Sequence, residues 1–335
     1  MIAKNLLFVG FASCWLVAAG CGDDGDAPCE GHGCPGAGVL ELPEGADIRI
    51  ETYDTGPNGA SERLVAMQAM FFKEQTPPAR SLEGIPIAGC TDMRSGILFD
   101  NGYSDGAQAI ADSRTYFDVG DTFTFTNVGS SAAFVIPKAT AIPDPSSYLT
   151  HPIGYTTDTW EDGLGGSTPP AAADVEMGQW YSMSFPGSAE LSEFAPSRGE
   201  TPAGVLIDGA DLKGIYLPQV TTMISPAEAD YYVHELPATG DMTYEWTVPT
   251  EAANAPNLFA FVSIFNNDTG AIDFTCIEPQ NDGNLVVPEE VIALAPASGS
   301  LLWGTFTHVG WEQEGRAHHT LGVQCKYGSY SKATE

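Results

Sequence analysis

Basic side chains are scarce in this chain of 335 residues, which contains 13 Lys and Arg against 44 Asp and Glu. The formal net charge is −31, and the few cations are scattered along the sequence. Such a chain offers no basic stripe to the phosphates of a nucleic acid and no polybasic patch to anionic lipids. The composition therefore excludes nucleic acid as a partner and indicates a solvated acidic surface.

Short catalytic motifs are also missing from the sequence. There is no G-x-S-x-G segment to expose a serine nucleophile, and no Gly-Lys-Ser or Gly-Lys-Thr to bind a nucleotide phosphate. His234-Glu235 begins like a zinc-protease helix, but Pro237 follows, and Ala238 stands where that motif has its second histidine. The sequence therefore predicts no catalytic residue, no metal site and no cofactor.

The N-terminus has the organisation of an export signal. Lys4 precedes the apolar run Leu6–Ala19, which is too short to span about 30 Å of hydrocarbon comfortably. The segment Val17–Cys21 (VAAGC) resembles the lipobox of bacterial lipoproteins, in which the cysteine is lipidated and becomes the first mature residue. Residues 1–20 are therefore expected to be a lipoprotein signal peptide, with Cys21 as the lipidation site. Ordinary cleavage that leaves Cys21 as a thiol is the alternative.

This resemblance also predicts a location. Lipid chains on one residue anchor a protein to a membrane without spanning it. Gly22 follows the cysteine, whereas Asp at that position retains such lipoproteins in the inner membrane. The resemblance therefore implies an exported protein of the cell envelope, held at the outer membrane where the host is Gram-negative. Residues 21–43, rich in Gly, Asp and Pro, are expected to form a flexible acidic tether.

From Asp47 onward, polar and apolar residues alternate with a period of two, which is typical of half-buried β-strands. In Thr122–Thr126 (TFTFT), two Phe face one side and three Thr face the other. We therefore predict an all-β, sandwich-like fold with very little helix, built from two antiparallel modules at 44–140 and 177–335. A Pro/Gly-rich irregular connection is expected at 141–176, and the helical exceptions at 105–111 and 288–295.

The alternation at Thr243–Val248 (TYEWTV) assigns an inner and an outer face. Tyr244, Trp246 and Val248 share one side of the expected strand, opposite Thr243, Glu245 and Thr247. The aromatic side is expected to pack inward and the other to face water. Trp246 is therefore predicted to be a core residue rather than a ligand contact.

Five cysteines remain once Cys14 leaves with the signal and Cys21 takes lipid, and an exported chain is expected to oxidise them. Cys29 and Cys34 lie close together in the tether and are candidates for a small surface disulfide. Cys276 and Cys325 both lie in expected strands and are a second candidate pair. Cys90 is then a buried thiol or the partner of one of those two, so the connectivity stays open.

Much of the mature chain resembles secreted lipoproteins of myxobacterial type. The resemblance is carried by loose motifs in a fixed order, which are EWTVP at 245–249, AFV at 260–262, Cys276, NDG at 281–283, LWG at 302–304 and VQC at 323–325. It implies an envelope location and a β architecture. No catalytic residue is carried over.

Two functions from different classes follow. The first is a non-enzymatic, lipid-anchored envelope protein whose β-sandwich binds an unidentified ligand or protein partner, or is structural. The alternative is a secreted hydrolase, for example one acting on glycans, that uses paired carboxylates facing each other across a cleft. The missing nucleophile and metal motifs favour the first.

Overall fold

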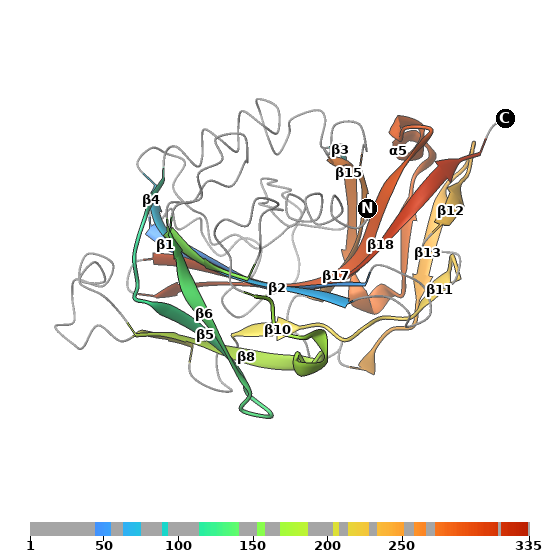
Figure 1. Ribbon diagram of the computed structural model, residues 1–335. Coiled ribbons are helices and arrows are strands. Elements are labelled where there is room, and N and C mark those ends of the chain that lie inside the picture. The colour runs from blue at the N-terminus through green and yellow to red at the C-terminus, as the bar shows by residue number, and fades with distance from the viewer. Residues whose placement is uncertain are drawn as a thin grey trace, which may run out of the picture.

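The computed structural model describes residues 44–54, 63–74, 89–92, 114–140, 153–157, 168–186, 204–207, 214–227, 233–250, 258–265, 272–313 and 316–333. Most of these residues belong to β-strands (Figure 1). The strands that precede residue 220 are β1 (Glu44–Asp54), β2 (Arg63–Glu74), β3 (Gly89–Asp92), β4 (Arg114–Tyr116), β5 (Thr122–Asn127), β6 (Ala133–Thr140), β7 (Ile153–Thr156), β8 (Gln179–Phe185), β9 (Gly204–Ile207) and β10 (Ile215–Leu217). Those that follow are β11 (Met223–Ser225), β12 (Val233–Leu236), β13 (Met242–Trp246), β14 (Leu258–Phe265), β15 (Ile272–Pro279), β16 (Asn284–Val287), β17 (Ser298–Gln313) and β18 (Arg316–Lys332).

Helix is confined to short pieces in the described part of the chain. The α-helix α5 spans Glu289–Leu294, and the 3-10 turns η2 and η4 span Ala172–Asp174 and Gln280–Asp282. The predicted helix at 288–295 is therefore confirmed. Pro288 precedes it, two acids occupy its first turn, and the backbone N–H of Glu289 donates to Asp241 Oδ1 at 2.9 Å. The predicted helix at 105–111 lies outside the described residues.

The strands of the described residues form two sheets. The larger has the order β10-β8-β5-β6-β7-β2-β1-β18-β17-β14-β15-β3, with β4, β9 and β12 pairing off this path. The smaller has the order β11-β13-β16. The all-β, sandwich-like class predicted from the alternation is confirmed. Most pairs are antiparallel as expected, but β1–β18 and β12–β18 are parallel.

The long hairpin β17–β18 joins the two ends of the molecule (Figure 1). Residues 317–326 of β18 pair with β1, whereas residues 329–332 pair with β12. The expected modules 44–140 and 177–335 therefore share one continuous sheet. The range 141–176, expected to be irregular, contains β7, which pairs with β2 and β6.

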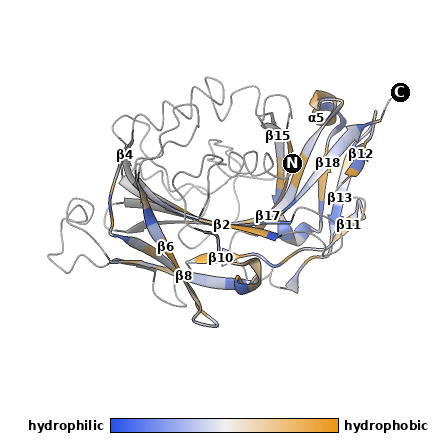
Figure 2. Ribbon diagram, viewed as in Figure 1, coloured by the Kyte–Doolittle hydropathy of each residue, from blue (hydrophilic) through white to orange (hydrophobic). Residues whose placement is uncertain are grey.

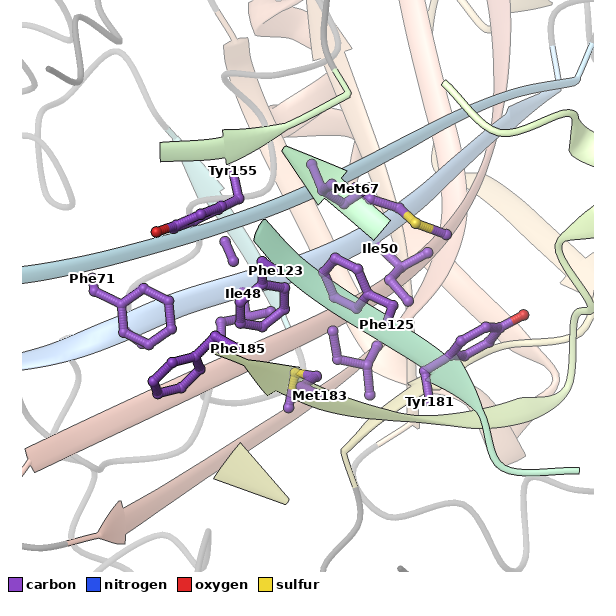
Figure 3. Close-up of a cluster of buried hydrophobic side chains, with 14 of the residues drawn as sticks. Ile48, Ile50, Met67, Phe71, Phe123, Phe125, Tyr155, Tyr181, Met183 and Phe185 are labelled. Carbon is purple, nitrogen blue, oxygen red and sulfur yellow. The ribbon is translucent and has the colours of Figure 1, made fainter. Parts of the chain in front are cut away.

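One hydrophobic cluster, here called the first core, lies between β1–β2 and the layer of β5, β6, β8 and β10 (Figure 3). Aromatic rings dominate it, and Phe71, Phe123 and Phe185 lie with their centroids 5.3–6.4 Å apart. Along β5, Phe123 and Phe125 are buried while the alternate threonines are half-buried, as the period of two predicts. Tyr181 and Met183 of β8 complete this cluster from beyond residue 176.

The second core lies between the small sheet and the β14–β15–β17 part of the large sheet. Trp246 is 2% exposed and Tyr244 is fully buried, whereas Glu245 between them is exposed. The predicted core position of Trp246 is therefore confirmed. Its ring lies 6.0 Å from that of Trp303, and its indole N–H donates to Gln280 O at 2.9 Å. Val248 lies beyond the end of β13 and is exposed, because the alternation stops with the strand.

β10 closes the first core by crossing the β17–β18 hairpin. Figure 2 shows β10 in orange, the colour of hydrophobic residues, and its Ile215 and Leu217 belong to the first core. Gly322 of β18 makes this approach possible, because a Cβ there would lie 2.0 Å from Tyr216 O. The hydroxyl of Thr320 donates to Gly214 O at 3.2 Å. The strand that ends the large sheet is therefore folded back onto its middle.

Candidate functional site

The disulfide differs from the candidate pair of Cys276 and Cys325. Cys276 of β15 forms a disulfide with Cys90 of β3, across 186 residues of sequence. Cys325 is instead a buried thiol on β18. Cys276 lies opposite Val262, and Val262 lies opposite Trp303, so these residues share one face of the sheet. Cys325 pairs with Gly304, the neighbour of Trp303, and therefore projects from the other face.

The pairing of Cys276 with Cys325 is thus corrected in favour of the open alternative in which Cys90 is the partner. Strands β14 and β17 also lie between β15 and β18 in the sheet, so Cys276 and Cys325 are not on neighbouring strands. The remaining site residues of the sequence analysis, Cys21, Cys29 and Cys34, lie outside the described residues.

Arg49, Glu51 and Tyr53 form a buried polar row on one face of β1, here called the charged row. Arg49 Nη1 lies 3.4 Å from Glu51 Oε1, with the two side chains 7% and 0% exposed. The Tyr53 hydroxyl donates to Glu51 Oε2, and Gln68 lies opposite Arg49 on β2 and is also buried. Burying two charges is costly, and their attraction and hydrogen bonds offset that cost.

The sequence did not reveal the charged row. Asp47–Tyr53 alternates, so its polar positions are those expected to face water. The periodicity gives the two faces of a strand correctly but does not show what covers each face. The signal that could have found the row is its Arg and Glu two residues apart in a strand whose other face is Ile48 and Ile50.

A second group of buried polar side chains lies on the opposite face of the large sheet, between the two cores. It consists of Trp303 and Thr305 of β17 and Gln324 of β18, here called the polar seam. All three are 0% exposed. Thr305 lies opposite Gln324, and Thr52 of β1 continues the same row across the sheet. The seam lies next to the point at which β18 leaves β1 and joins β12.

A hydrogen-bonded corner closes the rim of the first core. Lys138 Nζ lies 2.7 Å from Asp118 Oδ2, and Gly120 N–H donates to Asp118 Oδ1 at 2.9 Å. Burial opposes ionisation of Asp118, but these two hydrogen bonds prevail and lower the pKa of its carboxyl. The Tyr155 hydroxyl donates to Gly120 O at 2.7 Å and accepts from Val119 N–H at 3.1 Å. Burial raises the pKa of Tyr155, so its hydroxyl stays a neutral donor.

Three carboxylates of the described residues form ion pairs with basic side chains of the fold. Glu51 is next to Arg49, Asp54 lies 2.9 Å from Arg63, and Asp118 is next to Lys138. Burial, with the nearby charge of Asp282, raises the pKa of Glu278. A raised pKa in one acid does not make the pair of opposed carboxylates that a glycosidase uses. The described residues therefore add no support to the hydrolase alternative.

Two kinds of feature are absent from the described residues. Within these ranges, no three His, Cys, Asp or Glu side chains are grouped as metal ligands. In the same part of the chain, no helix has the length and apolar character needed to cross a membrane.

Comparison with known proteins yields weak structural likeness. No model of a protein family matches the chain, and no curated protein matches it. Among solved structures, the FN1-FN3 domains of chicken CNTN1 are similar at 12% identity, over 88% of this chain and 68% of that chain, with a TM-score of 0.20. A likeness of this size carries no argument about topology or function.

Proposed function

We propose that this protein is an exported, lipid-anchored protein of the cell envelope, whose β-sandwich region is a non-enzymatic binding or structural module. The observation that carries export is the disulfide between Cys90 and Cys276. Such bonds form and persist in oxidising compartments and are rare in the cytosol. The lipobox-like segment ending at Cys21 supports the anchor, and the Gly/Asp/Pro-rich tether supports a module held at a distance from the membrane.

The ion pairs of the buried carboxylates support a non-enzymatic role. The carboxylates of the charged row and of the Asp118 corner are bound to cations within the fold. The outer face of β5 is half-buried and that of β13 carries the exposed Glu245, and on β scaffolds of this kind the loops between strands bind partners.

The anchor is tested by labelling cells that express the full chain with radioactive palmitate. Wild type is expected to incorporate label and to partition into detergent, whereas Cys21→Ala should do neither. Cys29→Ala is the matched control, because it removes a cysteine of the same tether and should label like wild type. Equal labelling of wild type and Cys21→Ala would contradict the anchor.

Export is tested separately through the disulfide. Alkylation of cell extracts without reductant should leave Cys90 and Cys276 unmodified in the full chain. Deletion of residues 2–20 should leave the protein in the cytosol with both cysteines alkylated. A full chain whose Cys90 and Cys276 are alkylated as readily as those of the deletion variant would contradict export.

A further inference from the structure

Among the described residues, four hydrogen-bonding atoms of the polar seam have no partner within bonding distance. They are Trp303 Nε1, Thr305 Oγ1, Gln324 Nε2 and Gln324 Oε1. All belong to side chains that are 0% exposed. Trp303 and Thr305 are two residues apart on β17 and share a face, and Gln324 lies directly opposite Thr305. Of the eleven such atoms among the described residues, these four therefore lie together on one face of the β17–β18 pair.

Native proteins rarely leave such groups without partners. More than about 90% of buried polar groups have at least one hydrogen bond to protein or to ordered water. An unmade bond inside a low-dielectric interior is destabilising, and the penalty recurs for each atom. Four such atoms side by side in the middle of a sheet indicate that something completes their bonding.

The chemistry of the four atoms defines the occupant. The Trp303 and Gln324 nitrogens donate, Gln324 Oε1 accepts, and the Thr305 hydroxyl does either. The four atoms are uncharged, but Lys326, which is 2% exposed, lies opposite Trp303 on the same face. The seam therefore does not suit a metal cation, whereas water can accept a hydrogen bond from an ammonium and also bond the neutral atoms. Complete burial, between β10 on one side and the Trp246–Trp303 pair on the other, favours a small occupant.

We propose that the polar seam is a binding site for ordered internal water. Water both donates and accepts, and a buried water needs two to four polar partners, which the seam supplies. Register partners in a sheet have Cβ atoms about 5 Å apart, and neighbours on one face of a strand are about 7 Å apart. Bridging Thr305, Gln324 and Trp303 by water fits these spacings. The bound water joins the two cores at the strand pair that they share.

The decisive measurement is made on the wild-type protein. With tryptophan labelled by ¹⁵N, the indole N–H of Trp303 is assigned by its loss in Trp303→Phe. That proton is expected to show magnetisation transfer from a long-lived water, and ¹⁷O relaxation dispersion should detect water exchanging slowly with bulk. A Trp303 indole proton without such transfer, in a protein without slow water, would overturn the proposal.

Variants locate the water. Thr305→Val combined with Gln324→Leu is expected to abolish the Trp303 transfer and to lower the amplitude of the ¹⁷O dispersion. Thr124→Val combined with Ser184→Ala is the matched control, because this register pair lies half-buried on the other side of β5 and β8. Equal loss of amplitude in the control would overturn the assignment to the seam.

Thermal unfolding and mass spectrometry separate the other outcomes. If water completes the bonding, Thr305→Val alone should lower the melting temperature, because it removes a partner of bound water. A higher melting temperature in Thr305→Val and in Gln324→Leu would show that the atoms lack partners in the native protein, and the proposal fails. Native mass spectrometry that finds a stoichiometric organic molecule released on unfolding would also overturn it.

Discussion

The first and second cores belong to one sheet but are closed by different means. The rim of the first core is held by hydrogen bonds of Tyr155 and by the ion pair of Asp118 with Lys138. The second core has the Cys90–Cys276 disulfide at its edge and the Trp246–Trp303 pair inside. The first core therefore depends on local polar groups that respond to pH, whereas the second depends on a covalent link between distant segments.

The largest expected effect tests whether the shared sheet makes the cores unfold together. Trp246→Ala should cost about 3–5 kcal/mol, because it removes a buried ring and the hydrogen bond to Gln280 O. Phe123→Ala in the first core should cost a similar amount. Guanidinium denaturation followed by circular dichroism should show one transition, shifted in both variants. An unshifted second transition in either variant would separate the cores.

The disulfide gives the next largest effect and distinguishes the second core from the first. Replacing Cys90 and Cys276 by Ala should cost about 2–5 kcal/mol, because the bond closes a loop of 186 residues in the unfolded chain. Reductant should lower the melting temperature of wild type and leave that of the double variant unchanged. Equal sensitivity of the two proteins to reductant would point to another cysteine pair.

The hydroxyl of Tyr155 carries the corresponding test in the first core. Tyr155→Phe should cost about 1–3 kcal/mol, because it leaves the buried Val119 N–H and Gly120 O without their bonds. Tyr181→Phe is the matched control, since that hydroxyl donates to Glu176 O at 2.8 Å in a part-buried position, whereas both bonds of Tyr155 are buried. The control should cost less in urea denaturation. A Tyr155→Phe variant as stable as wild type would show that the hydrogen-bonded corner does not stabilise the first core.

The pH dependence should come mainly from the first core. Burial opposes ionisation of Asp118, but the bonds from Lys138 and Gly120 lower its pKa below the ordinary value near 4. A depressed folded-state pKa stabilises the fold above the unfolded value and loses that contribution as pH falls through the folded value. The acid-unfolding curve of Asp118→Asn should therefore be flatter than that of wild type. Glu289→Gln, an exposed acid of α5, is the control.

The sequence predicted the buried face best for strands that have one buried and one exposed face. Thr122–Thr126 and Thr243–Trp246 alternate because one face packs and the other is wet, and their inner faces were predicted correctly. β1 is buried on both faces, so the same pattern placed Arg49 and Glu51 on a water-facing side. The polar seam was missed for a related reason, because Trp303, Thr305 and Gln324 stand in strands whose covering layers come from far along the chain.

Non-local pairing accounts for the rest. The parallel pairing of β1 with β18 joins residues more than 270 positions apart, and no turn or local pattern specifies it. The partner of Cys276 stayed open for the same reason, because the connectivity depends on β3 joining the edge of the sheet beside β15. Local features such as the Pro288 start of α5 needed only neighbouring residues, and they were predicted.

The smallest effect is expected on the wet face of the second core. Glu245 is exposed between two buried residues of β13, so Glu245→Ala should change stability by about 0.5 kcal/mol or less. The sign of the change is informative. The chain carries a net charge of −31, and removing one acid reduces self-repulsion, which favours the compact state. Loss of a strand residue by truncation to Ala acts in the opposite direction.

Glu245→Gln separates these two contributions, because it removes the charge and keeps the length of the side chain. Glu245→Gln should be at least as stable as wild type at low salt, and added salt should reduce the difference by screening the surface charges. Chemical denaturation at two ionic strengths checks both statements. If Glu245→Gln unfolds as readily as Trp246→Ala, the outer face of β13 is not wet. The outer side of the small sheet would then be buried against polar groups, and the second core would also depend on polar interactions, as the first core does.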